Sequence, residues 1–515
     1  MRIGQRIAVL AAGLIAAVSF VSSTSFAKGG DKIAGEYLVK YRGQGFVSMA
    51  SVGQTKNIFV ADHNPYAHIL KVQVSPSAEA VALADLLSNP NVEYVVPNVR
   101  LKAFTNPYEA TVLKEQWAIK KVNAEAAWAK AGNKGSRNVL VAVIDTGADY
   151  NHESLKGNMV TGFDFITNTG DPMDKTSSAN PGHGTHCAGI IGATGLVEGG
   201  TIGISPEVSI MPIRFLDENG SGDLNNGIKA IDYAIQKKVR VISASWGATI
   251  DRGQAGPLVE AVKRADDAGV IFVVAAANDG KSNDTTEVYP ANAGFQNTIA
   301  VAASGPNDEK PQWSNYGKRT VHLAAPGLNI MSTLPGNKYQ NLSGTSMATP
   351  LVSGLVAFLL SQDSALTGSQ MRALLQTTGA KVQIETASNT RVDALAAVNA
   401  ILAKSLFIAP AAGTLAVGET MKFSGVHGAG GYTYTTSNPA AGAIAADGTF
   451  TAAAVGDTTI SVKDSSGTTA SSLTVSVADK TATPDPGQPG GDCPIGDQSM
   501  CDIICGIKPD LPFCK

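Results

Sequence analysis

An excess of charge of either sign is missing from this sequence, and so is any long basic run. The 40 Lys and Arg residues nearly balance the 43 Asp and Glu residues, and charged residues make up 16% of the 515 positions. Nucleic acids and anionic membranes are bound through clustered Lys and Arg side chains. We therefore expect neither partner, and the function has to be sought in local motifs.

Long apolar runs are also scarce. The N-terminal stretch IAVLAAGLIAAVSFV follows Arg2 and Arg6, and the tripeptide SFA at 25–27 supplies the small residues of a signal peptidase site. This run is shorter than the ~20 residues that cross a bilayer, which disfavours a retained membrane anchor. We interpret 1–27 as a secretory signal that is removed. No later stretch is long and apolar enough to span a membrane, so the mature protein is expected to be secreted.

Cysteine is nearly absent from the first nine tenths of the chain. Four of the five cysteines lie in the last 23 residues, at Cys493, Cys501, Cys505 and Cys514. In an oxidising compartment they predict two disulfides that close a small tail, and three pairings are open. A zinc cluster is the alternative, although the spacings fit no common finger. Cys187 stands alone, and we interpret it as a small buried apolar residue whose thiol could still react with mercurials.

The length predicts about three domains, and the pattern of helix and strand signals changes along the chain in keeping with that number. Residues 28–104 mix strand and helix patterns and predict a small α+β unit. Residues 105–404 alternate helical patterns with continuous apolar strands, which is typical of a parallel sheet covered on both faces. These strands are expected at 139–144, 208–213, 239–245, 270–277 and 298–302.

The C-terminal quarter has a different composition. Residues 407–478 are rich in Thr, Ser, Gly and Ala, with period-2 stretches and turn signals such as Asp447-Gly448. This pattern predicts a small antiparallel β-sandwich, of the kind found in bacterial Ig-like domains. It has no aromatic stripe for stacking on sugars, so we expect a spacer or a surface-contact role. Residues 479–491 are Pro- and Gly-rich and predict an extended linker before the Cys-rich tail at 492–515.

Three short motifs carry the chemistry. VAVIDTGAD ends a predicted strand at Asp145, GHGTHCAG places His183 before a helical stretch, and GTSMATP places Ser346 at the entrance to a helix at 347–360. Functional groups of a parallel sheet gather at the carboxyl ends of its strands. There an imidazole can take the hydroxyl proton, a carboxylate can orient the imidazole, and the helix N-terminus can stabilise an oxyanion. The sequence thus supplies an acid, a base and a nucleophile.

Other enzyme classes fit these motifs less well. Asp-Thr-Gly also occurs in aspartic proteases, and a Ser at a helix start is often only an N-cap. No Gly-x-Ser-x-Gly elbow surrounds the nucleophile, which disfavours an esterase or lipase. His186 follows His183 by three residues, but no His-Glu-x-x-His motif supports a metalloenzyme. A binding or adhesion protein on a protease-like scaffold remains the alternative from a different class.

The order of the three motifs resembles that of the subtilisin-like serine proteases, and HGTHCAG is similar to the proteinase K side of that family. The resemblance implies a catalytic α/β domain at 105–404 with the triad Asp145, His183 and Ser346. It also implies that Asn278, in VVAAANDG, donates to the oxyanion. The implied function is that of a monomeric serine endopeptidase which acts on proteins, requires no cofactor and is made as a zymogen.

The same resemblance implies how the substrate binds. Two segments are expected to pair with an extended peptide through their main chains, which lets a protease accept many sequences. Residues 28–104 resemble the inhibitor-type propeptide of the family, with a ferredoxin-like fold, so their end RLKAF is expected in the cleft and the cut near 104–105. The Trp246 side chain is expected to line the cleft rather than the core. The pairing segments are Gly220, Ser221 and Gly222 and Ser245, Trp246 and Gly247.

Some residues depart from the family pattern. Ala277 stands where the family usually has Gly before the oxyanion Asn, which predicts a narrower pocket for the residue that precedes the cut. Ser154 replaces the Asp of a strong calcium site, and that site is expected to be absent. Asp171 and Asp174 in DPMD are candidate ligands of a structural calcium, with a solvated loop as the alternative.

Overall fold

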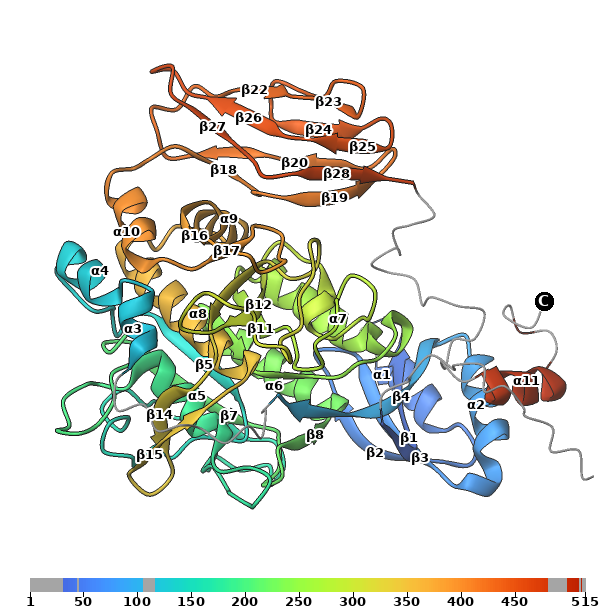
Figure 1. Ribbon diagram of the computed structural model, residues 1–515. Coiled ribbons are helices and arrows are strands. Elements are labelled where there is room, and N and C mark those ends of the chain that lie inside the picture. The colour runs from blue at the N-terminus through green and yellow to red at the C-terminus, as the bar shows by residue number, and fades with distance from the viewer. Residues whose placement is uncertain (1–30, 44–45, 105–115, 480–497, 509–510, 512–515) are drawn as a thin grey trace, which may run out of the picture.

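The computed structural model describes residues 31–43, 46–104, 116–479, 498–508 and 511 (Figure 1). The predicted signal at 1–27 lies outside the described residues. So do nearly all of the predicted linker, Cys493 and Cys514.

Residues 31–104 form an antiparallel sheet with strand order β2-β3-β1-β4, covered by helices. Its two faces bury different cores. In β1, Val39 packs toward helix α2, whereas its neighbour Leu38 packs toward the following domain, because successive strand residues point to opposite faces. The elements are β1 (Lys32–Tyr41), α1 (Phe46–Gly53), β2 (Ile58–Asn64), β3 (Ile69–Val74), η1 (Pro76–Ala78), α2 (Glu79–Leu87) and β4 (Val92–Ala103).

A nine-stranded sheet forms the central domain, in the order β16-β17-β13-β12-β11-β9-β5-β7-β6. All neighbouring pairs are parallel except β16 with β17. All five apolar strands expected from the sequence lie in it, which confirms the α/β prediction. Its strands are β5 (Leu140–Asp145), β6 (Phe163–Asp164), β7 (Ser209–Arg214), β9 (Val241–Ala244), β11 (Ile271–Ala275), β12 (Thr298–Ser304), β13 (Leu323–Pro326), β16 (Ala380–Lys381) and β17 (Thr390–Arg391).

Helices cover both faces of this sheet. In β5, Val141 and Val143 join the core on the side of α5 and α8, while Ala142 and Ile144 join the core under α6 and α7. Burial on both faces explains why these strands are apolar throughout. The helices are α3 (Trp117–Lys121), α4 (Ala124–Ala131), α5 (His183–Gly192), α6 (Leu224–Gln236), α7 (Arg252–Asp267), η2 (Ala291–Ala293), α8 (Thr345–Gln362), α9 (Gly368–Thr378) and α10 (Ala394–Leu402), and the shorter strands are β8 (Ser221–Asp223), β10 (Trp246–Gly247), β14 (Ile330–Leu334) and β15 (Lys338–Leu342).

Helix α8 is the one helix in the described part of the chain that is long and apolar enough to cross a membrane, with mean hydropathy 1.3. However, 89% of it is buried inside the molecule. Its apolar character is therefore that of a core helix of the central domain.

Short strands between 407 and 478 form a separate unit (Figure 1). They enclose their own core, which includes Phe423, Phe450 and Ile460. The first strand, β18, contributes Ile408 to this core and also packs on α9, where Phe407 belongs to the core of the central domain. His427 and Lys404 both contact Asp363 at the end of α8, at 3.0 and 2.7 Å. The strands are β18 (Phe407–Ala409), β19 (Gly413–Ala416), β20 (Thr420–Lys422), β21 (Ser424–Val426), β22 (Thr433–Thr436), β23 (Gly442–Ile444), β24 (Thr449–Ala452), β25 (Gly456–Thr458), β26 (Ile460–Lys463), β27 (Thr469–Ser471) and β28 (Val475–Ala478).

Helix α11 (Gln498–Ile507) lies in the Cys-rich tail. In Figure 1 it lies beside α2, on the side of the N-terminal sheet away from the central domain.

Candidate active site

Asp145 and His183 form a buried pair at the carboxyl end of β5. The Nδ1 atom of His183 lies 2.7 Å from Oδ1 of Asp145, and each side chain is 1% exposed. Helix α5 begins at His183 because Asn180 accepts hydrogen bonds from the backbone N–H groups of Gly182 and His183, at 3.0 and 2.8 Å. The carboxylate can thus fix the orientation of the ring.

The charge of Asp145 changes the basicity of this histidine. Burial is the largest single influence and lowers the pKa of His183, but the attraction and hydrogen bond of the Asp145 carboxylate, together with the neighbouring Cys187, outweigh it and raise that pKa well above its usual value. The protonated ring is therefore stabilised. A ring of this kind can hold the proton that a hydroxyl gives up during attack on a carbonyl.

Ser346 lies in the first turn of α8, and its hydroxyl faces the end of β4. The Oγ atom donates a hydrogen bond to the carbonyl oxygen of Phe104 and lies 3.1 Å from the carbonyl oxygen of Ser245. Among the described residues, Nε2 of His183 has no hydrogen-bond partner. Cys187 joins the two parts of the site, since its Sγ lies 4.0 Å from Nδ1 of His183 and 3.5 Å from the carbonyl oxygen of Ser346.

Asn278 binds the same carbonyl group. Its Nδ2 atom donates to the oxygen of Phe104 at 2.8 Å. Its Oδ1 atom accepts from the backbone N–H of Thr345 at 3.0 Å and from the Thr345 hydroxyl at 2.9 Å. These two donors leave only the amide nitrogen free to face the Phe104 oxygen. This role of Thr345 was not predicted from the sequence, although its position beside Ser346 in GTSMATP was the available signal.

Strand β4 lies in a cleft between β8 and β10 and pairs antiparallel with both. Lys102 pairs with Ser221 on one side and with Gly247 on the other. The backbone N–H of Ala103 donates to the carbonyl oxygen of Gly220 at 2.9 Å, and that of Phe104 donates to Ser245 at 3.2 Å. Both segments predicted to pair with an extended peptide thus do so with RLKAF, residues 100–104. The remaining three pairs are Arg100 with Asp223, Leu101 with Gly222 and Ala103 with Trp246.

The prediction that the Trp246 side chain lines the cleft is wrong. The side chain is fully buried, its indole N–H donates to the carbonyl oxygen of Ile144 at 2.7 Å, and its ring contacts Phe215 edge-on. In β10 the main chain of Trp246 pairs with β4, while its side chain points into the core. Trp246 therefore contributes only backbone to the cleft.

The ring of Phe104 fills the position of the residue before the predicted cut. A Cβ atom added at Gly247 would lie 2.9 Å from this ring, so only glycine leaves it room. Ala277 is fully buried beside Asn278 and has φ +90°, a conformation that residues with a Cβ rarely adopt. Whether Ala277 narrows the pocket stays a prediction.

The two acidic residues proposed for calcium have different surroundings. Asp171 is exposed and accepts a hydrogen bond from the Tyr150 hydroxyl at 2.7 Å. Asp174 is buried, and its Oδ2 accepts from the backbone N–H and the hydroxyl of Thr185, at 2.9 and 2.6 Å. Asp174 therefore anchors the first turn of α5. Calcium at this loop stays a prediction.

The three remaining residues singled out in the sequence, His186, Cys187 and Ser154, are all buried and have ordinary packing or hydrogen-bonding roles. Burial lowers the pKa of His186 to about 3, so its ring is neutral, and Nε2 lies 2.9 Å from the carbonyl oxygen of Gln340. Cys187 is fully buried, which agrees with its interpretation as a small core residue. Ser154 contacts the Tyr339 hydroxyl at 2.7 Å.

Comparisons with known proteins identify the family of the central domain. Residues 136–396 match the subtilase family. Thermitase of Thermoactinomyces vulgaris is 40% identical over 276 residues, 54% of this chain and 92% of thermitase. The thermophilic serine proteinase of Bacillus sp. (strain AK1) is 37% identical over 65% of this chain and 79% of that protein. The major intracellular serine protease of Bacillus subtilis (strain 168) is 43% identical over 48% and 75%. This chain therefore belongs to the subtilase family and is a serine endopeptidase.

Proposed function

We propose that the chain is a secreted zymogen which cuts itself after Phe104 and then hydrolyses other proteins. The observation that carries this proposal is the carbonyl group of Phe104, whose oxygen accepts hydrogen bonds from both Asn278 and Ser346. A carbonyl held beside a nucleophile and an amide donor has the surroundings of a scissile group.

Each residue of the site then has a distinct role. The Ser346 oxygen attacks the Phe104 carbonyl carbon while His183 takes the hydroxyl proton, and Asp145 holds the ring in place. Asn278, together with the backbone N–H of Ser346, stabilises the negative oxygen of the tetrahedral intermediate. His183 returns the proton to the leaving amine, and water then releases the acyl group from Ser346.

Residues 28–104 are proposed to be the intramolecular inhibitor. Their element order is β1-α1-β2-β3-α2-β4, which is that of ferredoxin-like units. Their contacts with the central domain include an ion pair between Lys40 and Glu260 at 2.7 Å and a hydrogen bond from Asn64 to Asp232 at 3.1 Å. Asp62 is paired with Lys229.

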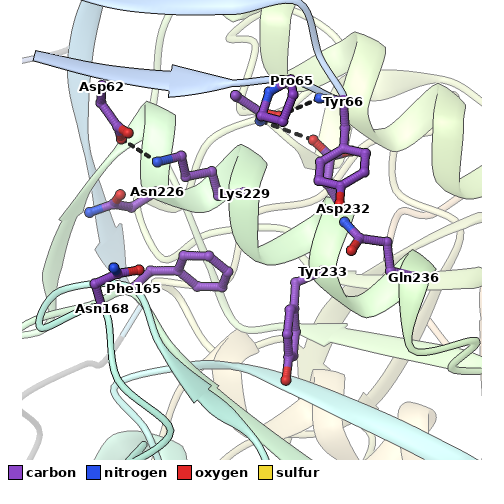
Figure 2. Close-up of a pocket in the computed structure, with 11 residues that line it drawn as sticks. Asp62, Pro65, Tyr66, Phe165, Asn168, Asn226, Lys229, Asp232, Tyr233 and Gln236 are labelled. Carbon is purple, nitrogen blue, oxygen red and sulfur yellow. Dashed lines mark hydrogen bonds and ion pairs between the residues drawn. The ribbon is translucent and has the colours of Figure 1, made fainter.

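A polar crevice of about 390 Å³ remains beside these contacts (Figure 2). Figure 2 shows the ion pair of Asp62 with Lys229 at its edge, with Tyr66 of the N-terminal unit facing Tyr233 of α6 across it. The interface also has an apolar part, since Leu38, Val99 and Leu101 pack in one core with residues of α6 and α7. We propose that this inhibitor leaves after the cut.

The remaining assignments are also proposals. The strands of 407–478 and their separate core support an Ig-like β-sandwich that acts as a spacer. Cys501 and Cys505 are each disulfide-bonded, but their pairing stays open. We also propose that the chain is exported through the signal at 1–27 and that the enzyme is a monomer. A structural calcium is proposed at Asp171 and Asp174.

Casein clearing by the purified chain, beside a Ser346→Ala variant, tests the proposed function. We expect the wild type to clear casein, and the variant to remain inactive and at precursor size. Equal clearing by both would exclude Ser346 as the nucleophile. No clearing by either, with correct folding shown by circular dichroism, would favour a binding protein on a protease scaffold.

A further inference from the structure

The N-terminal unit buries an element from the far end of the chain. Ile504 of α11 is fully buried and Cys501 is 1% exposed, and both belong to the core that α2 forms with one face of the N-terminal sheet. Leu511 is also part of this core. The apolar face of α2 is thus closed by the Cys-rich tail.

The apolar contact is accompanied by a charge contact. The Nζ atom of Lys508 lies 2.9 Å from Oδ1 of Asp85 in α2 and donates to the hydroxyl of Ser88 at 2.6 Å. The opposite side of α11 has a different character, because Ile503 and Ile507 are 52% and 43% exposed. Helix α11 therefore contacts α2 through one defined face.

We propose that the outer face of residues 31–104 is a binding surface for α11, and that the tail holds the propeptide on the enzyme after the cut. This inference rests on the proposed cut after Phe104. Once that bond is broken, residues 28–104 are joined to the rest of the chain only by non-covalent contacts. The cleft contributes pairing with β8 and β10, and α11 contributes a second contact on the opposite side.

The effect of this second contact follows from its tethering. Helix α11 stays covalently joined to the catalytic domain through residues 480–497, so its contact with α2 is intramolecular until the propeptide leaves. Short tethers raise the effective concentration of such contacts to about the millimolar range. A propeptide that detaches from the cleft is therefore rebound, and the active enzyme emerges more slowly. The tail would set the delay between cutting and activity.

Adjacent residues of α11 provide a matched pair of variants. Ile504→Asp places a carboxylate in the buried contact, whereas Ile503→Asp places the same side chain on the exposed face. The delay between the cut, followed by intact mass, and full casein activity is measured for each full-length protein. We expect Ile504→Asp to shorten the delay about tenfold, equivalent to about 1.4 kcal/mol of binding, and Ile503→Asp to match the wild type. Equal delays in all three proteins would overturn the proposal.

A charge exchange tests the same surface independently of the apolar contact. Lys508→Glu and Asp85→Lys should each shorten the delay, by about two- to threefold for a half-exposed ion pair. The double variant should restore the wild-type delay, because it re-forms the pair with its charges reversed. Absence of this restoration, with both single variants active, would contradict a direct contact.

Docking is also measured without any cut. In the Ser346→Ala precursor, amide hydrogen exchange across α2 should be faster when Ile504→Asp is added and unchanged with Ile503→Asp. Equal exchange in both would exclude docking. If instead α2 is protected as expected but the wild type never cuts itself, the proposed function fails while the binding surface stands.

Discussion

At the residue scale, Thr345 decides which atom of Asn278 faces the carbonyl of Phe104. The two donors of Thr345 occupy Oδ1 of Asn278, so a reversed amide would place two N–H donors against each other and take the amide donor away from the Phe104 oxygen. The side-chain hydroxyl also accepts from the backbone N–H of Ala277 at 3.2 Å. Thr345 is therefore a positioning residue for the oxyanion donor.

Replacement of this hydroxyl by a methyl group tests its role. Thr345→Val keeps the shape and the backbone donor, and we expect kcat to fall about fivefold with KM nearly unchanged, since the hydroxyl's hydrogen bond to Asn278, worth about 1 kcal/mol, is lost. Asn278→Ala should cost more, about 10²–10³ in kcat, which is the scale known for this donor in subtilisin itself. A change of KM alone in Thr345→Val would contradict the positioning role.

The backbone conformation of Ala277 leads to a second prediction. At φ +90° its Cβ is strained, and glycine would relieve that strain at a cost in unfolded-state entropy. Ala277→Gly should therefore change the free energy of unfolding by no more than about 0.5 kcal/mol, whereas a buried Ala→Gly change in an ordinary conformation costs about 1 kcal/mol. Denaturant unfolding in the Ser346→Ala background measures this. A loss well above 1 kcal/mol would show that the alanine is unstrained.

The basicity of His183 predicts the pH dependence of the first cut. The raised pKa of His183 moves the range in which the ring is neutral to higher pH, and only the neutral ring can accept the Ser346 proton. The rate of precursor cutting should thus rise with pH along a limb whose midpoint lies above 6.5. The same shift stabilises the precursor below that range and loses its effect as pH rises through the raised pKa. A midpoint at or below 6.5 would contradict the buried ion pair.

At the element scale, the start of α5 depends on the buried Asp174. Burial raises the pKa of this carboxyl from 3.8 to about 7, although the hydrogen bonds from Thr185 oppose the change. The folded chain therefore keeps a proton that the unfolded chain loses as pH rises from about 4 to about 7. The free energy of unfolding should therefore fall across this window, by ~1.4 kcal/mol for each unit by which folding raises the pKa of Asp174.

The variant Asp174→Asn separates this effect from the rest of the molecule. Its amide oxygen still accepts from Thr185 but does not titrate. We expect the fall in the free energy of unfolding between about pH 4 and pH 7 to become smaller than in the parent, measured by denaturant unfolding on the Ser346→Ala precursor. An unchanged pH slope would show that Asp174 is ionised in the folded state.

Elements with long patterns were predictable, and very short ones were not. The five buried strands of the central sheet are continuous apolar runs, and α8 was expected at 347–360 and spans Thr345–Gln362. The two- and three-residue strands β6, β8 and β10 are too short to show a period, and a segment of this kind led to the error at Trp246. The docking of α11 on α2 joins residues more than 400 positions apart, which no local pattern encodes.

At the scale of the whole molecule, β4 connects the core of the N-terminal unit with the active site. Its twelve residues begin in the core beneath α2, continue along α6 and end in the cleft of the active site. The position of RLKAF in the cleft followed from the resemblance to the propeptides of the family. The donor role of Asn278 also followed from that resemblance, whereas the contacts of Thr345 that orient this amide did not, because they depend on the geometry around one side chain.

The most direct test of this account is the intact mass of both fragments after the full-length chain has been produced, beside the Ser346→Ala variant. We predict that the wild type yields a propeptide whose last residue is Phe104, while the variant remains one uncut chain. A propeptide that ends elsewhere, or the same cut in the variant, would contradict the assignment of Ser346 and the Phe104 carbonyl as the reacting groups.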